Sequence, residues 1–172
     1  ETHPILEKNI RINNLINTKA FQYGLSDHVG KARFYHVDNA PNSYSLGRKS
    51  QQEKDFEEIS LITIDHLVIR ENITQLDVIK LDVEGAEELV LQGAITAIKK
   101  FRPKIIFEIS RAALSRMNLT QDGVNEFFQG LEYSFFSVQQ NGELNSLNFP
   151  KKGNNIAIPN EQVEFFLTKK NN

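Results

Sequence analysis

The chain has 172 residues, enough for one domain with a sizeable hydrophobic core. Its net charge of −2, with 40% hydrophobic and 24% charged residues, gives no electrostatic reason to expect nucleic acid or an anionic membrane as a partner. The lack of cysteine excludes disulfides, thiolate zinc sites and cysteine nucleophiles. No apolar run approaches the roughly 20 residues that span a bilayer, so we expect a soluble, cytoplasmic domain.

The first third of the chain predicts a helix followed by three strands. Pro4 lies near the start of the helix, where its missing N–H is not needed, and apolar residues recur on one side as far as Leu15. Asp65 can cap a helical turn that follows the third strand. The predicted strands span residues 19–25, 32–37 and 59–64, and a polar surface loop is predicted over residues 38–58.

The clearest unit is a strand, a helix and a strand joined by short links. Residues 78–81 form a short apolar strand. From Ala86 to Phe101 apolar residues recur at three- and four-residue steps, which predicts one helix packed on a sheet, and Pro103 ends it. Residues 104–110 predict a second buried strand. Because a helix connects the two strands, they should run parallel.

The last third predicts a further helix and an antiparallel edge. The helix is expected over residues 124–131, and strands over residues 133–138 and 155–158, with a turn at Asn141-Gly142 between them. Together the elements predict an α/β domain built on a doubly wound, mostly parallel sheet.

Acidic residues follow the two predicted parallel strands, where the ligand crevice of an open α/β sheet lies. Asp82 ends the first strand, and Glu84 shares its face if the extended geometry persists. Glu108, inside the second strand, must be paired, hydrogen-bonded or turned toward a cleft, because a lone buried carboxylate is costly. The pattern predicts a polar site at this edge of the sheet. The alternative for Asp82 and Glu84 is a structural role as helix N-caps.

The run V-I-K-L-D-V-E-G-A-E-E-L-V-L-Q-G-A, followed by R-P-K-I-I-F-E, resembles the signature of the FkbM family of S-adenosylmethionine-dependent methyltransferases. Weaker matches cover most of the chain in order, among them E-T-H-P-I-L-E-K-N-I-R-I-N, L-I-T-I-D-H-L and N-N-I-A-I-P. The resemblance implies a class I, Rossmann-like methyltransferase fold. It also implies methyl transfer from S-adenosylmethionine to a hydroxyl of a sugar, glycan or polyketide-like small-molecule acceptor.

The resemblance assigns residues to the cofactor. Glu1 matches the acid that holds the ribose hydroxyls, and Ser26 and Asp27 fall where the adenine is approached. Asp82 and Glu84 fall beside the methionine moiety and the reacting methyl group. Asp82 is therefore expected in both the cofactor site and the catalytic site.

Methyl transfer to a hydroxyl usually needs a base that removes the hydroxyl proton. The catalytic candidates are Asp82 and Glu84, with Glu108 ranked behind them. His36 and His66 are further candidates because imidazole titrates near neutral pH, but neither has the spacing of a catalytic triad or a metal site, and a structural role is favoured for both.

One part of the family pattern has no counterpart. The first strand and its D-x-G-x-N-x-G loop should precede Glu1, and the nine glycines of the chain include no G-x-G cluster. On the resemblance, residues 1–172 are therefore a single methyltransferase domain, truncated at its N-terminus and missing its first strands. The strand that ends at Asp82 would then expose an edge. Three outcomes stay open: the remaining strands close the gap, another chain such as a second copy covers the edge in a homo-oligomer, or the chain alone is only marginally stable.

Two alternatives stay open at this point. In the first, Asp82 and Glu84 are oxygen ligands for Mg²⁺ or Mn²⁺ in a metal-dependent transferase, although no third ligand is evident. In the second, the chain is a non-catalytic, methyltransferase-like module that serves only in assembly.

Overall fold

The computed structural model describes residues 2–36, 44–45, 56–139 and 143–168. None of the helices in these ranges is long and apolar enough to cross a membrane. The elements are, in chain order, α1 (Thr2–Ile12), β1 (Gly24–Leu25), β2 (Gly30–His36), β3 (Tyr44–Ser45), β4 (Phe56–Ile62), α2 (Ile64–Arg70), β5 (Val78–Leu81), α3 (Glu87–Gln92), α4 (Ile95–Phe101), β6 (Lys104–Ile109), α5 (Arg111–Arg116), α6 (Gln121–Phe128), β7 (Tyr133–Val138), β8 (Leu144–Leu147), β9 (Gly153–Pro159) and α7 (Asn160–Thr168).

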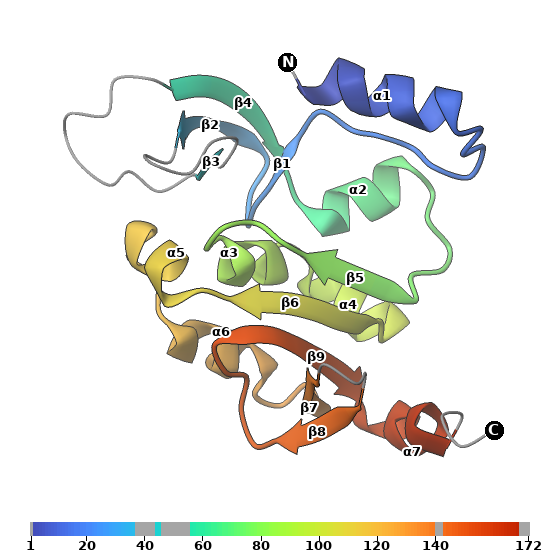
Figure 1. Cartoon of the computed structure of the whole chain (residues 1–172), viewed down its shortest axis with the longest axis vertical. Coiled ribbons are helices and arrows are strands. Elements are labelled where there is room, and N and C mark those ends of the chain that lie inside the picture. The colour runs from blue at the N-terminus through green and yellow to red at the C-terminus, as the bar shows by residue number, and fades with distance from the viewer. Residues whose placement is uncertain (1, 37–43, 46–55, 140–142, 169–172) are drawn as a thin grey trace.

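The larger sheet has five strands in the order β5-β6-β9-β7-β8 (Figure 1). β5 and β6 run parallel, with Val78 opposite Lys104 and Leu81 opposite Phe107. The parallel pairing predicted for the strand–helix–strand unit is confirmed. β9 returns antiparallel between β6 and β7, and β8 pairs antiparallel with β7.

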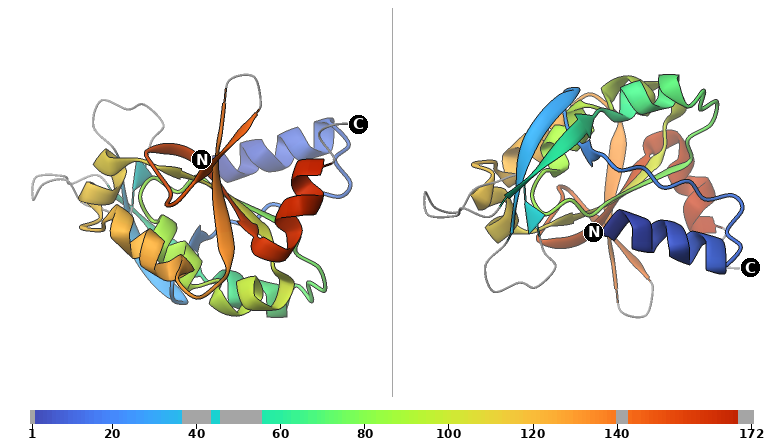
Figure 2. Two further views of the ribbon diagram at one scale, coloured as in Figure 1. Left: turned by 90° about the horizontal axis from the view of Figure 1, so that it is seen from below. Right: turned by 90° about the horizontal axis from the view of Figure 1, so that it is seen from above.

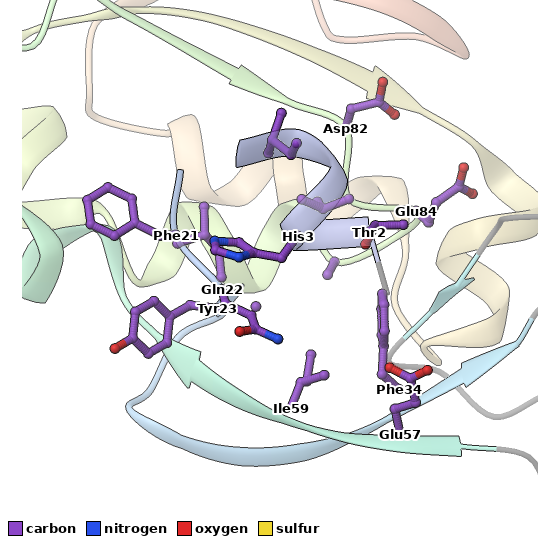
Figure 3. A pocket seen from close by; sticks show the side chains of 15 residues that line it. Thr2, His3, Phe21, Gln22, Tyr23, Phe34, Glu57, Ile59, Asp82 and Glu84 are labelled. Carbon is purple, nitrogen blue, oxygen red and sulfur yellow. The ribbon is translucent and has the colours of Figure 1, made fainter. Parts of the chain in front are cut away.

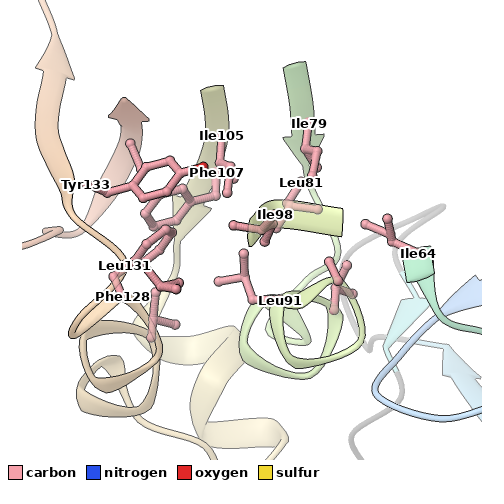
Figure 4. Packing of buried hydrophobic residues seen from close by; sticks show 14 of the residues in the cluster. Ile64, Ile79, Leu81, Leu91, Ile98, Ile105, Phe107, Phe128, Leu131 and Tyr133 are labelled. Atoms are coloured by element: carbon pink, nitrogen blue, oxygen red, sulfur yellow. The ribbon is translucent and has the colours of Figure 1, made fainter. Parts of the chain in front are cut away.

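The main core lies between one face of this sheet and the helices α3, α4 and α6 (Figures 2 and 4). Phe107 of β6 is fully buried, and its ring stacks on Phe128 of α6 with centroids 5.8 Å apart. Leu81 of β5 and Ile98 of α4 are also fully buried in this core. The apolar stripe read from residues 86–101 therefore faces the sheet, as predicted.

The opposite face of the sheet is covered in part by α7. Phe136, Ile156 and Ile158 form a second buried cluster there, against Val163 and Phe166 of α7. Successive residues of a strand point to opposite faces, so β7 and β9 contribute side chains to both cores.

The smaller sheet has four strands in the order β1-β4-β2-β3. β1 runs parallel to β4, whereas β2 runs antiparallel to both β3 and β4. Within the described residues, parallel pairing occurs only between β1 and β4 and between β5 and β6, so the fold is mixed α/β. The expected doubly wound, mostly parallel sheet is not confirmed. Strands with short connections, such as β7 and β8, pair antiparallel because a parallel pair needs a longer crossover.

β5 lies at an edge of the larger sheet, as the sequence predicted. β1 lies at an edge of the smaller sheet, and no strand in the described residues joins the two. Val78 at the start of β5 keeps 51% of its surface exposed. An unpaired edge offers backbone N–H and C=O groups to another strand, which is compatible with pairing between two copies of the chain. The expected homo-oligomer stays a prediction.

The single helix predicted from Ala86 to Phe101 is wrong, because α3 and α4 are separated at Gly93-Ala94. The carbonyl of Gly93 accepts a hydrogen bond from the N–H of Asp65 at 3.0 Å instead of continuing one helix. A Cβ on Gly93 would lie 2.1 Å from the carbonyl oxygen of Ser26. Contacts with distant segments therefore interrupt a pattern that is locally helical.

Other expected elements also differ. The strand predicted over residues 19–25 is reduced to β1, and Phe21 and Tyr23 lie instead beside the guanidinium of Arg70. The predicted loop contains β3 and the start of β4, and its remaining residues lie outside the described ranges, as does the turn at Asn141-Gly142. α5 and α7 were not predicted.

Candidate active site

The loop that follows β5 is held in an unusual backbone conformation. Glu84 and Gly85 are consecutive residues with positive φ, 51° and 104°. A Cβ on Gly85 would lie 2.4 Å from the carbonyl oxygen of Ala113 in α5. Only glycine fits this close approach, so the loop turns sharply from β5 into α3 while packed against α5.

A cavity of about 500 Å³ lies between this loop, α1 and the smaller sheet (Figure 3). Aromatic side chains line much of it, and Asp82 and Glu84 lie on its other side with their carboxylates turned away from Phe21 and Tyr23 (Figure 3). The imidazole Nε2 of His3 is buried here without a hydrogen-bond partner in the described residues. The lining residues are Thr2, His3, Leu6, Phe21, Gln22, Tyr23, Gly24, Leu25, Phe34, Glu57, Ile59, Asp82, Val83, Glu84 and Ala86.

A second, smaller cavity of about 140 Å³ adjoins the first, because Asp82 and Glu84 line both. Its other lining residues are Glu87, Glu108 and Ser110, so every side chain around it carries oxygen. We call it the acidic cavity. The two cavities together form one site with a largely apolar compartment and a strongly polar one.

Two cations lie next to the acids. Lys80 Nζ is 3.5 Å from Asp82 Oδ2, and Arg116 NH2 is 3.3 Å from Glu84 Oε2. The Arg116 side chain is only 14% exposed, so its charge is poorly screened by water. Asp82 and Glu84 are thus each paired with a cation.

Glu87 is the buried acid of the site, with 3% of its surface exposed. Its Oε1 accepts a hydrogen bond from the N–H of Gly85 at 3.3 Å, and its Oε2 has no partner in the described residues. Burial raises the pKa of Glu87, and the nearby charge of Glu84 adds to the increase. Glu87 is therefore easier to protonate than an ordinary glutamate.

The structure brings together three of the predicted site residues, since Asp82, Glu84 and Glu108 all line the acidic cavity. Glu108 is exposed and lines this cavity. A position facing a cleft is one of the three environments expected for a carboxylate inside an apolar strand. Ser26 and Asp27 directly follow β1 but line neither cavity. Ser26 is buried, and its hydroxyl donates to the Asp27 carboxylate at 3.0 Å.

Two of the three further candidates fall outside what the structure describes. Glu1 and the side chain of His36 lie outside the described residues. His66 lies in α2 and is not among the lining residues of either cavity.

Sequence reasoning missed several lining residues. Neither Glu87 nor His3 was singled out from the sequence. Phe21, Tyr23 and Ser110 were not proposed as site residues. No local signal marks them, because their positions at the cavities depend on how α1, β1 and α5 pack around the loop after β5.

The geometry gives no support to a metal site. Within the described residues, no group of three or more His, Cys, Asp or Glu side chains is placed to hold a metal ion. Mg²⁺, one of the two metals of the metal-dependent alternative, needs oxygen ligands that converge at about 2.0–2.1 Å.

The comparison with protein families decides the wider relationship. The family model described as the methyltransferase FkbM domain matches residues 1–143, most of the chain. The chain belongs to the FkbM methyltransferase family. Searches of curated proteins and of solved structures found no match. In this FkbM domain, β5, the loop after it and α3 carry the run that suggested the family. The same segment carries Asp82, Glu84 and Glu87, three of the four acids that line the acidic cavity.

Proposed function

We propose that this FkbM domain transfers a methyl group from S-adenosylmethionine to a hydroxyl of a sugar, glycan or polyketide-like acceptor. The observation that carries the proposal is the meeting of the two cavities at Asp82 and Glu84. One compartment suits a partly aromatic cofactor, and the other presents carboxylates to an incoming hydroxyl.

The residues of the larger cavity fit the cofactor. Its volume, about 500 Å³, lies within the range of roughly 300–1,000 Å³ typical of small-molecule sites. Phe21, Tyr23 and Phe34 would hold the apolar and aromatic part of the cofactor, and Asp82 and Glu84 its polar part. The unpartnered His3 Nε2 leaves a buried hydrogen-bonding group for a ligand to satisfy.

The remaining assignments from the family pattern belong to the same proposal. Ser26 and Asp27 follow Gly24 and Leu25, which line the larger cavity, and Glu1 precedes Thr2, which lines it as well. We assign Ser26 and Asp27 to the adenine side and Glu1 to the ribose.

When bound, the cofactor supplies a methyl group on a positively charged sulfur. The protein must hold the acceptor oxygen in line with that group and take the hydroxyl proton. One of the carboxylates of Asp82, Glu84 and Glu108 accepts the hydrogen bond that the acceptor hydroxyl donates. That carboxylate takes the proton as the oxygen gains the methyl group. Lys80 and Arg116 form ion pairs with Asp82 and Glu84 and so help to hold these two carboxylates in place.

The first test is a calorimetric titration of S-adenosylhomocysteine into the chain and into an Asp82→Ala variant. We expect saturable binding that weakens about tenfold or more in the variant, as loss of a charged hydrogen-bond partner usually does. Asp77→Ala is the matched control. Asp77 directly precedes β5, whereas Asp82 directly follows it, and Asp77 lines neither cavity. A folded chain that does not bind S-adenosylhomocysteine would contradict the proposal and favour the non-catalytic module.

A further inference from the structure

The acidic cavity contains an acceptor atom that the protein itself does not satisfy. Glu87 lines this cavity and is 3% exposed, and its Oε2 is buried without a hydrogen-bond partner in the described residues. Buried polar atoms are almost always hydrogen-bonded, so an unpaired one in a cavity points to a missing donor. The remaining lining groups, three carboxylates and the hydroxyl of Ser110, are also acceptors that a ligand donor can reach.

The charge of the cavity is only half compensated. Lys80 and Arg116 pair with Asp82 and Glu84, whereas no ion pair among the described residues involves Glu87 or Glu108. Burial and the charge of Glu84 already disfavour the ionised form of Glu87. A cation in the cavity would attract the Glu87 carboxylate, and this attraction would offset both its desolvation and its repulsion by Glu84.

The geometry favours an ammonium group over a metal ion. No group of three or more potential metal ligands converges in the described residues. An ammonium group carries three donors and no acceptor, which complements a wall of carboxylates without fixed coordination distances. The cavity, about 140 Å³, holds one such group rather than a whole ligand, and it opens beside the larger cavity through the shared Asp82 and Glu84.

We propose that the acidic cavity binds a primary ammonium group, with Glu87 at its buried side and Glu108 at its exposed side. The group comes either from the α-amino group of the cofactor or from an amino substituent on the acceptor. Amine binding stands without methyl transfer, whereas the assignment of its source rests on the proposed function.

The test is an NMR titration of the ¹⁵N-labelled chain with ethanolamine and, in parallel, with its neutral analogue ethylene glycol. The amide of Gly85 is the reporter, because its N–H donates to Glu87. We expect ethanolamine to shift this amide saturably and ethylene glycol to leave it unchanged. In Glu87→Gln, which keeps the shape of the side chain, the dissociation constant for ethanolamine should rise about tenfold or more.

Two further variants keep the result interpretable. Glu126→Gln removes one exposed carboxylate from α6, away from both cavities, and should bind ethanolamine as the parent chain does. Glu108→Gln changes an exposed residue and gives a second reading if Glu87→Gln does not fold. Equal shifts with ethylene glycol, or unchanged ethanolamine binding in both Glu87→Gln and Glu108→Gln, would overturn the ammonium site.

Competition separates the two sources. If the cofactor supplies the group, S-adenosylhomocysteine should displace ethanolamine, and 5′-methylthioadenosine, which lacks the amino acid, should not. If the acceptor supplies it, ethanolamine and S-adenosylhomocysteine should bind together. Binding of S-adenosylhomocysteine without any binding of ethanolamine to the free chain would overturn the ammonium site and leave the proposed methyltransferase function standing.

Discussion

The carboxylate of Asp65, in the first turn of α2, accepts hydrogen bonds from the backbone N–H groups of Ala97 at 2.7 Å and Thr96 at 3.0 Å in α4. In the same place the N–H of Asp65 donates to the carbonyl of Gly93 at 3.0 Å. One residue thus satisfies groups on both sides of the break between α3 and α4. This contact connects the end of the smaller sheet to the helices that pack on the larger one.

Replacing Asp65 should therefore destabilise the chain. We expect Asp65→Ala to lower the free energy of unfolding by about 1–2 kcal/mol, as the loss of a capping side chain does. Asp65→Asn keeps one acceptor oxygen and should lose roughly half as much. Urea unfolding of the three proteins measures the effect. An unchanged midpoint in Asp65→Ala would show that the capping of α4 contributes nothing to stability.

Gly85 fixes the path of the site loop, and its replacement should cost both stability and ligand binding. Gly85 and Gly130 both have positive φ, but a Cβ on Gly85 would meet Ala113 at 2.4 Å, whereas Gly130 has open space around it. Gly130→Ala should cost about 1–2 kcal/mol for the backbone conformation alone. Gly85→Ala should cost a further 1–3 kcal/mol or so for overpacking.

The comparison of these two glycine variants isolates the contact with α5. Calorimetry with S-adenosylhomocysteine should show weaker binding only for Gly85→Ala, because only there does the loop that carries Asp82 and Glu84 have to move. If Gly85→Ala and Gly130→Ala lost equal stability, the close approach to Ala113 would be unimportant.

Much of the site was predictable because its acids belong to local patterns. Asp82 and Glu84 follow a short apolar strand, and Glu108 lies in the next one, so the rule that ligands bind at the carboxyl ends of parallel strands was enough to group them. Glu87 was not predicted as a site residue. A carboxylate in the first turn of a helix has an ordinary explanation, and its burial follows only from the turn at Gly85.

The parts of the fold that escaped prediction depend on contacts between distant segments. Asp65 was expected to cap the turn behind the strand at residues 59–64, but Thr63 caps α2, accepting from the N–H of His66 at 2.9 Å, and Asp65 caps α4 instead. The pairing of β9 between β6 and β7 likewise joins residues far apart in sequence. Periodicity identifies such elements but does not place them.

The bidentate ion pair between Arg102 and Glu161 should make stability depend on acid. Arg102 donates to both carboxylate oxygens of Glu161 at 2.9 Å, and this pairing lowers the pKa of Glu161 to about 2. A lowered pKa adds stability above the unfolded value near 4.5, and that stability is lost as the pH falls toward about 2. Because the Glu161 side chain is 53% exposed, solvent screening limits the gain to about 0.2–1 kcal/mol.

Glu161→Gln tests this pair. At neutral pH the variant should be less stable than the parent chain by that amount, and the difference should vanish below pH 2, where Glu161 is protonated and both side chains are neutral. Thermal unfolding across this pH range is the measurement. A difference that persists unchanged in acid would mean that packing, and not the charge of Glu161, accounts for it.

Glu87 should give the opposite dependence. Burial raises the pKa of Glu87 above the unfolded value of 4.5. At a pH between the unfolded and the folded pKa, Glu87 therefore keeps its proton in the folded chain and has released it in the unfolded chain. Its contribution to stability is fully present below about pH 4.5 and is lost as the pH rises through the higher folded value. Glu87→Gln cannot ionise, so its melting temperature should exceed that of the parent chain by a margin that grows with pH and then levels off. The pH at which the margin levels off reports the folded pKa.

Glu126→Gln removes an exposed carboxylate and should show no such growth. If the difference in melting temperature stayed constant with pH, Glu87 would titrate as an ordinary glutamate. Its unpartnered Oε2 in the acidic cavity would then not be desolvated.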